Sequence, residues 1–401
     1  MNKYLFLIIL VISSCKKVND DCNLFEYPQA PGIEWFESVK GSEKESHGHF
    51  IITCTDGGYL QVGETGLMSH SSKILVVKTD KKGNVIWKQE FGTSGVNLGN
   101  SALETTDSYI VCGALDGNSA LIKLEKNTGI KKVSYVIDNG GADAFEHLIE
   151  TSNGFLGVGY VHAQDLTNTF FTEGEGYITF LDSLGLKLYG LNISANLSQA
   201  YRIQSFGNHF YISGLTQKAQ EYGLLKIDSL GGILWSKKYG GTADDHCFGM
   251  DIEPDDGSIF LTGHTLSGTE NWDTYTMKID SSGNLRWESR AGNPRGFNPR
   301  FIHDEAWDVK STGDGGCIIV AGTGDEYNRY VRRCGSDGDD SNTWHIYLVK
   351  YDANGFIEWQ QTYGSENGID WAGEALDLTP DGGAIIGVDN GGFGYLKIEA
   401  F

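Results

Sequence analysis

The sequence predicts an all-β protein, a seven-bladed β-propeller with four antiparallel strands in each blade. The first observation is a recurring hairpin motif, K-x-D-x-x-G-x-x-x-W, in which an alternating strand, a Gly-containing turn and a second strand end on an aromatic residue. Its clear copies are "KTDKKGNVIW" (78–87), "KIDSLGGILW" (226–235), "KIDSSGNLRW" (278–287) and "KYDANGFIEW" (350–359), with degenerate copies at 123–135 and 180–189.

The second observation is another hairpin that precedes each copy of the motif. Its turn reads Asp-Gly-Gly at 56–58, 314–316 and 381–383. The two hairpins together make a unit of four strands in roughly 50 residues, which is typical of a propeller blade. The tryptophans of the motif are expected to pack between blades rather than to contact a ligand.

The third observation concerns the two ends of the chain. The last unit stops after its third strand, and "GIEWFESVKG" (32–41) near the N-terminus resembles "NVIWKQEFG" (84–92), with Trp35 in the place of Trp87. We therefore expect the N-terminal strand to complete the last blade and close the ring, which leaves no open sheet edge.

The N-terminus indicates export. Lys3 precedes an apolar run that is too short to span a bilayer, and "ISSC" ends at Cys15. This pattern predicts a lipoprotein signal at 1–14, a lipidated tether at 15–32 beginning with Cys15, and the propeller at 33–401. We expect an outer-membrane lipoprotein whose membrane contact is its lipid anchor; an ordinary secretory signal is the alternative.

Composition limits the partners. The net charge of −22 argues against nucleic acid, because contacts to phosphates need a basic surface. The remaining cysteines form no CxxC pair and no regular spacing, so a disulfide framework is not indicated. We expect a monomer.

Histidines and arginines gather on one rim of the predicted ring. Eight of the ten histidines fall at starts of innermost strands, at ends of second strands or in the loops that follow. All eight arginines lie at or after Arg202, and six fall in 290–301 and 328–334, including Arg300 and Arg329. Guanidinium groups bind carboxylate or sulfate, so this rim could bind an anionic ligand. The alternative is that these arginines pair with neighbouring acidic residues.

His49 and His70 form the predicted catalytic pair. His49 starts the innermost strand of the first blade, and the hairpin returns His70 to the same rim. One imidazole could act as a base while the second orients it or donates a proton. Tyr160, Tyr201 and Arg202 are expected to line the same region. A purely structural role for both histidines is the alternative.

A metal site is a separate possibility. His264, His303, Cys334 and His345 offer nitrogen and sulfur ligands for a structural Zn²⁺, although their spacing matches no standard finger. The run "SDGDDSN" (336–342) could bind Ca²⁺ or be a solvated acidic loop. No cofactor is expected to be required for catalysis.

Three stretches of the chain resemble a known family. They are "HGHFIITCTDGGYLQVGETG" (47–66), "HDEAWDVKSTGDGGCIIVAGTGDEY" (303–327) and "WHIYLVKYDANG" (344–355). The chain resembles the seven-bladed propeller ulvan lyases of polysaccharide lyase families 24 and 25 over about 33–401. The resemblance implies β-elimination at the uronic acid of ulvan, a sulfated algal polysaccharide. It also implies that His49 and His70 are the family's histidine pair, that a tyrosine shares in the acid–base catalysis and that an arginine neutralises the uronate carboxylate; Tyr160 and Arg202 are the candidates for these two roles by their rim position.

Two other classes remain open from the residues alone. The same rim could belong to a non-catalytic, surface glycan-binding lipoprotein that lacks a proton-transfer pair. A scaffold for protein partners fits any propeller, but it predicts a large apolar patch on the rim, which these polar loops do not indicate.

Overall fold

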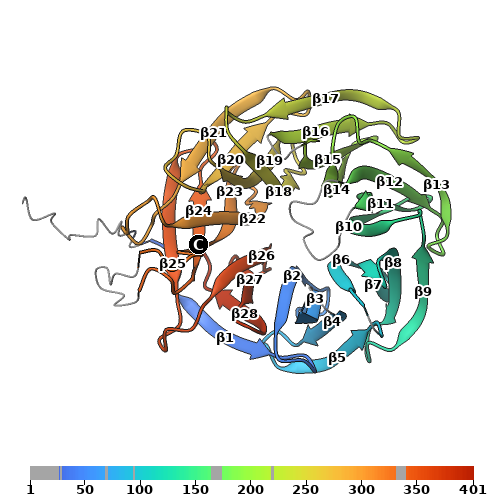
Figure 1. Cartoon of the computed structure of the whole chain (residues 1–401), viewed down its shortest axis with the longest axis horizontal. Coiled ribbons are helices and arrows are strands. Elements are labelled where there is room, and N and C mark those ends of the chain that lie inside the picture. The colour runs from blue at the N-terminus through green and yellow to red at the C-terminus, as the bar shows by residue number, and fades with distance from the viewer. Residues whose placement is uncertain are drawn as a thin grey trace, which may run out of the picture.

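The computed structural model describes residue 27 and residues 29–67, 71–93, 95–163, 174–217, 221–330 and 340–401. In this part of the chain, 28 strands form seven four-stranded antiparallel sheets. The sheets stand around a common axis like the blades of a propeller, and the chain passes from each blade to the next (Figure 1). The predicted fold is thus confirmed.

Each blade runs from its innermost strand outwards. Blades 1 to 4 comprise β2(Ser46–Thr53), β3(Tyr59–Leu67), β4(Ser71–Thr79), β5(Val85–Phe91); β6(Leu98–Glu104), β7(Ser108–Leu115), β8(Asn118–Glu125), β9(Lys131–Ile137); β10(Ala142–Thr151), β11(Gly154–Ala163), β12(Glu175–Leu181), β13(Lys187–Asn192); and β14(Gln199–Phe206), β15(His209–Leu215), β16(Tyr222–Ile227), β17(Ile233–Tyr239). Blades 5 to 7 comprise β18(Asp245–Ile252), β19(Ile259–Thr265), β20(Asp273–Ile279), β21(Leu285–Ala291); β22(His303–Ser311), β23(Cys317–Gly324), β24(His345–Tyr351), β25(Ile357–Tyr363); and β26(Ala372–Leu378), β27(Ala384–Asp389), β28(Phe393–Ile398), β1(Ile33–Val39).

The ring closes through the N-terminal strand, as predicted. β1 pairs antiparallel with β28, and Trp35 lies opposite Lys397. The described end of the predicted tether also packs on the propeller: Tyr27 contacts the core between blades 6 and 7, and the Tyr363 hydroxyl donates to the Pro31 carbonyl at 2.8 Å. The predicted signal (1–14) and Cys15 lie outside the described residues. Within the described ranges, no helix has the length and apolarity needed to span a bilayer.

The Asp-Gly-Gly turns adopt their form because glycine tolerates the left-handed backbone. Gly57 has a φ of 81°, and the Asp56 carboxylate accepts the backbone N–H of Gly58 at 2.9 Å. A lysine of the third strand joins this turn: buried Lys78 donates to Asp56 at 3.0 Å and to the Thr79 carbonyl at 2.8 Å. Lys350 and Lys397 make equivalent pairs in blades 6 and 7. The Lys of the repeat and the Asp of the Asp-Gly-Gly turn therefore serve blade structure.

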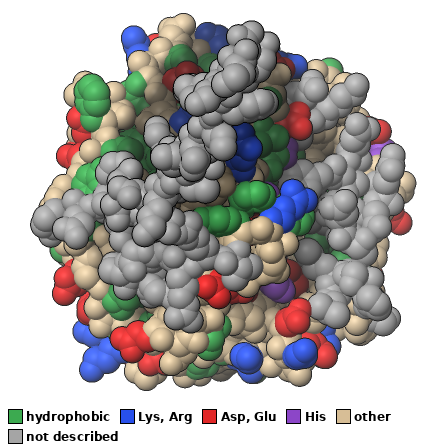
Figure 2. All heavy atoms as spheres, turned by 60° about the vertical axis from the view of Figure 1, so that its left-hand side comes forward, with side chains coloured by type: hydrophobic (Ala, Val, Ile, Leu, Met, Phe, Trp, Pro, Cys, Tyr) green, Lys and Arg blue, Asp and Glu red, His purple; other side chains and the backbone are tan. Residues whose placement is uncertain are grey.

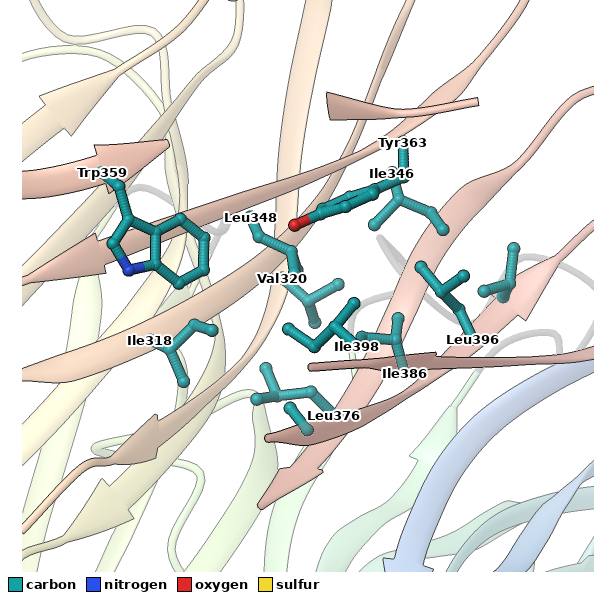
Figure 3. Packing of buried hydrophobic residues seen from close by; sticks show 12 residues of the cluster. Ile318, Val320, Ile346, Leu348, Trp359, Tyr363, Leu376, Ile386, Leu396 and Ile398 are labelled. Atoms are coloured by element: carbon teal, nitrogen blue, oxygen red, sulfur yellow. The ribbon is translucent and has the colours of Figure 1, made fainter. Parts of the chain in front are cut away.

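The core consists of apolar layers between neighbouring blades. Between blades 6 and 7, Val320 and Leu348 face Leu376 and Ile386, and Trp359 lies at the edge of the cluster (Figure 3). Trp87 is likewise buried, packs near Tyr109 of the next blade and donates its indole N–H to the Lys126 carbonyl at 2.9 Å. The motif tryptophans thus pack between blades, as predicted.

Candidate functional site

A β-bulge interrupts the innermost strand of every blade at the same place. In blade 1, Gly48 pairs with Gly63 and Phe50 pairs with Val62, so His49 is an extra residue between them. A bulge re-aims a side chain and is frequent beside functional sites. The extra residues, here called the bulge ring, are His49, Asn100, Glu146, Tyr201, Phe248, Trp307 and Glu374.

The bulge ring is divided into two arcs. Blades 7, 1, 2 and 3 contribute the polar arc, and blades 4, 5 and 6 contribute the aromatic arc. The polar arc consists of Glu374, His49, Asn100 and Glu146, and the aromatic arc consists of Tyr201, Phe248 and Trp307. Because the seven innermost strands surround one axis (Figure 1), these residues encircle it at one level.

His49 is the cation of the polar arc. Its Nε2 lies 2.9 and 2.8 Å from the two carboxylate oxygens of Glu64, which is fully buried on β3. Burial works against the charged imidazole, but Glu64, Glu374 and Glu146 outweigh it and raise the pKa of His49 to about 9. His49 is therefore an imidazolium at neutral pH, and 21% of its side chain is exposed.

Two carboxyl groups on either side of His49 titrate near neutrality. Burial raises the pKa of Glu146 to about 7, although the charges of Arg202 and His49 oppose the rise. Burial and the neighbouring Asp389 carboxylate raise the pKa of Glu374 to about 8 against the charge of His49. Strongly perturbed groups that share one region of a molecule are candidates for acid–base work. The arc thus combines a fixed cation with two carboxyl groups of different proton affinity.

Only His49 of the catalytic pair predicted from the sequence lies in the described part of the chain. His70 lies outside the described residues, so its distance from His49 is not defined. That an imidazole with a near-neutral pKa acts as the base stays a prediction, while the raised pKa of His49, about 9, favours the imidazolium. The neighbouring His47 pairs instead with Asp389, with Nδ1 at 2.8 Å from a carboxylate oxygen.

Tyr160 is not part of the bulge ring. It lies on β11, packs with Leu98, Ala114 and Ala144 between blades 2 and 3, and is only 1% exposed. Burial raises the pKa of its phenol well above the ordinary value. A side chain so deeply packed cannot reach a substrate in this conformation, so the predicted catalytic role of Tyr160 is inconsistent with its position.

Tyr201 and Arg202 lie at the predicted place. Tyr201 belongs to the aromatic arc, and its hydroxyl donates to Gln199 at 2.8 Å. Arg202 follows the bulge, donates to the Tyr201 carbonyl at 3.1 Å and places its guanidinium 5.7 Å from the centre of the Phe50 ring. Its Nε has no hydrogen-bond partner. Arg202 is thus a buried cation beside the polar arc.

The other arginines of the predicted rim that the structure describes have local partners. Arg300 is exposed and donates to Glu270 at 3.0 Å, and Arg329 lies over the ring of Tyr327 at 4.5 Å. Arg295 is buried and donates to the Thr343 carbonyl at 2.6 Å. On the face shown in Figure 2, basic and acidic side chains are interspersed, in keeping with local pairing.

The three predicted zinc ligands that the structure describes, His264, His303 and His345, do not form a cluster of ligand atoms. His303 and His345 lie on β22 and β24, which flank β23, so two strand spacings, about 10 Å, separate them. His264 is buried against His246, with their ring nitrogens 3.2 Å apart, and Cys334 lies outside the described residues, as does most of 336–342. Among the described residues, one other group has ligand atoms within 4.8 Å of one another: His303, Glu305 and Glu326. Nδ1 of His303 lies 3.1 Å and 3.3 Å from these two carboxylates, which accounts for the group as ion pairs.

Sequence reasoning missed Glu64, Glu146 and Glu374, and, of the aromatic arc, Phe248 and Trp307. A signal was present, because each bulge residue stands seven positions before the Asp or Asn of the turn that follows it. His49 precedes Asp56, Trp307 precedes Asp314 and Glu374 precedes Asp381 by this interval. Aligning the repeats on their turns would therefore have placed the seven residues in one ring.

The chain matches no protein-family model and no curated protein sequence. Its fold is similar to a catalytically inactive virginiamycin B lyase from Staphylococcus aureus with quinupristin (TM-score 0.54, 11% identity, 90% of this chain and 99% of that one). It is also similar to Kuenenia stuttgartiensis hydrazine synthase (TM-score 0.55, 9% identity, 87% and 94%). A third similar structure is the Neurospora crassa Pan2 WD40 domain (TM-score 0.54, 12% identity, 88% and 89%). At such low identity these similarities show the propeller fold alone.

Proposed function

We propose that the protein is a polysaccharide lyase that cleaves a uronate-containing anionic polysaccharide, ulvan being the first candidate, by β-elimination at the polar arc. One observation carries the proposal: His49 is a fixed cation between two carboxyl groups whose pKa values are about 7 and about 8. Pairs of carboxyl groups with separated pKa values are a recurrent basis for acid–base division of labour.

β-Elimination needs three groups. A cation must stabilise negative charge on the uronate carboxylate as C5 loses its proton, a base must take that proton, and an acid must protonate O4. In our proposal the imidazolium of His49 holds the carboxylate. Glu146 is the base, because the charge of Arg202 opposes the rise of its pKa and favours the carboxylate, and Glu374, whose pKa is raised by burial and by Asp389, is the acid.

The electron pair of the C5–H bond becomes the C4=C5 double bond, and the C4–O4 bond breaks as Glu374 gives its proton to O4. One product carries an unsaturated uronate at its new end, and the other carries a free hydroxyl. No oxidant, reductant or cofactor enters this balance. The roles differ from those inferred from the sequence, in which histidine and Tyr160 exchanged the protons.

Incubation of the purified protein with ulvan, followed by ultraviolet absorbance of unsaturated uronate ends, tests the proposal. Glu146→Gln and Glu374→Gln should each lower kcat by about 100-fold or more. Glu366→Gln, at an exposed residue of the loop before β26 that is not part of the bulge ring, is the matched control. An absence of unsaturated ends from ulvan and other uronate polysaccharides would overturn the proposal. Retention on affinity electrophoresis without chain shortening would instead select the glycan-binding alternative.

The same proposal places the protein at the outer membrane, tethered through lipid on Cys15. Its support is the N-terminal sequence, in which a short apolar run ends at this cysteine. Metabolic labelling with radioactive palmitate should mark the full-length chain and not Cys15→Ser. Equal labelling of the two chains, or none of either, would refute lipidation at this residue.

A further inference from the structure

A pair of tryptophans extends the aromatic arc away from the axis. Trp307 belongs to the bulge ring, and its ring centre lies 4.6 Å from that of Phe248. Trp272 precedes β20 at the same rim of blade 5, since its carbonyl accepts the backbone N–H of Asp304 at 2.9 Å. His264 lies between the two indoles, with its ring centre 4.9 Å from Trp272 and 5.7 Å from Trp307.

Both indoles are partly open to solvent, whereas the rings behind them are buried. Trp272 and Trp307 are half-buried, and Phe248, His246 and His264 are each 4% exposed or less. Trp272 packs on His246 at 4.6 Å between ring centres. The indoles are thus held in place by a rigid aromatic layer, so little side-chain entropy remains to be lost when a ligand binds.

The layer behind the indoles is uncharged. Burial lowers the pKa of His246 to about 4 and lowers that of His264 well below its usual value. Both imidazoles are therefore neutral under ordinary conditions, and they offer no charge to an anion or a cation. An aromatic surface with a neutral backing favours a ligand that presents a flat apolar face.

We propose that Trp272 and Trp307 form a sugar-stacking subsite that binds the C–H face of a pyranose ring next to the uronate held by His49. The inference rests on the proposed function and deepens it, because it assigns the neighbouring sugar of the polymer to the aromatic arc. Trp307 shares the bulge ring with His49, so one chain that crosses the axis reaches both arcs. The two arcs thus bind different parts of the ligand: the polar arc binds the uronate carboxylate, and the aromatic arc binds the neighbouring pyranose ring.

Indole fluorescence tests the subsite without requiring turnover. Ulvan oligosaccharides added to Glu146→Gln should change the tryptophan fluorescence and give a Kd. In that background Trp272→Leu and Trp307→Leu should each weaken the Kd about five- to tenfold, in line with the usual strength of aromatic contacts. Free glucuronate, too small to reach both arcs, should bind all three proteins equally. Trp235→Leu, a tryptophan on the outer strand β17, is the matched control, and thermal melting checks that each variant is folded.

The outcomes separate this inference from the lyase proposal. Unchanged oligosaccharide affinity in folded Trp272→Leu and Trp307→Leu would overturn the subsite even if the wild-type protein cleaves ulvan. Weakened affinity in these variants would support the subsite even if the wild-type protein releases no unsaturated ends, in which case the lyase proposal alone fails. A wild-type protein that binds no oligosaccharide would overturn the subsite.

Discussion

Nε2 of His49 lies 2.8 Å from a carboxylate oxygen of Glu64 on the neighbouring strand of the same hairpin. The bulge at His49 makes this contact possible, because an extra residue shifts the side chain relative to the regular pairing of Gly48 with Gly63. Glu64 is fully buried, so the pair is only weakly screened by solvent. One backbone irregularity thus favours a protonated imidazole at neutral pH in an acidic protein.

Replacing Glu64 by glutamine should therefore lower the pKa of His49 toward its ordinary value. Without the carboxylate, burial is opposed only by Glu374 and Glu146, and the pKa of His49 should fall from about 9 toward 6.5 or below. Titration of the imidazole by NMR measures this change directly. His162, whose pKa is raised by Asn139 and Glu175 and does not depend on Glu64, should keep its raised pKa and serves as the internal control. A His49 pKa that stays near 9 in Glu64→Gln would refute the assignment of its cause.

Stability should fall as the pH rises through the range of Glu374. The folded-state pKa of about 8 exceeds the ordinary value of 4.5, so the folded protein retains a proton that the unfolded chain loses. The contribution of this carboxyl group is complete below about pH 4.5 and is lost progressively up to about pH 8. The pKa of His49 is also raised by folding, so its contribution to stability is likewise lost as the pH rises between 6.5 and about 9.

Glu374→Gln should remove the Glu374 part of this dependence, because the amide cannot ionise. We expect the variant to melt several degrees higher than the wild-type protein at pH 8 and at nearly the same temperature at pH 5. Melting curves across this range provide the measurement, with Glu366→Gln as the exposed control. A melting temperature that changes between pH 5 and pH 8 by the same amount in the wild-type protein and in Glu374→Gln would contradict the prediction.

The buried lysines of the repeat should contribute to stability and not to activity. Lys350 is 4% exposed and donates to Asp314 at 2.9 Å, to Glu358 at 2.8 Å and to the Tyr351 carbonyl at 3.0 Å. Lys350→Met should lower the free energy of unfolding by about 1–3 kcal/mol, since the carbonyl loses its buried donor. Urea unfolding measures the loss. The exposed Lys131→Met should change it by less than about 0.5 kcal/mol, and equal stability of the two variants would contradict this role.

The sequence was sufficient for the fold because its signals are local and repeated. The Asp-Gly-Gly turn at 56–58 and the aromatic Trp87 recur in register along the chain, and each copy specifies its own hairpin. Closure was also predictable, because the motif around Trp35 lacks a blade of its own until it pairs with β28. These features depend on neighbours within about ten residues and on repetition, both of which are visible in a linear sequence.

The site was predictable only in part, because its geometry depends on the direction in which each side chain points and not only on the order of the loops along the chain. Loop order correctly placed His49 and Arg202 near the axis. The same reasoning misplaced Tyr160, since loop order does not say that its ring turns between blades 2 and 3. Glu146 and Glu374 look like ordinary strand residues until the bulges bring them into one ring with His49. Their pKa values arise from burial, which no local motif reveals.

Arg202 provides the last and most discriminating prediction. Its guanidinium opposes the rise in the pKa of Glu146, so Arg202→Met should move that pKa above about 7. A rise of one pKa unit reduces the fraction of Glu146 that is a carboxylate at pH 7 from about one half to about one tenth, and it lowers the rate in proportion. The acidic limb of the pH–rate profile should move to higher pH, whereas the alkaline limb, which Glu374 sets, should stay in place.

Arg202→Lys should restore much of the neutral-pH rate, because it keeps a positive charge near Glu146. The exposed Arg286, paired with Asp280 at 2.7 Å, supplies the control Arg286→Met, for which no change in profile is expected. NMR titration of the Glu146 carboxyl group gives the same answer without a substrate. An unchanged Glu146 pKa in folded Arg202→Met would show that the guanidinium does not set it, and the assignment of Glu146 as the base would lose its physical reason.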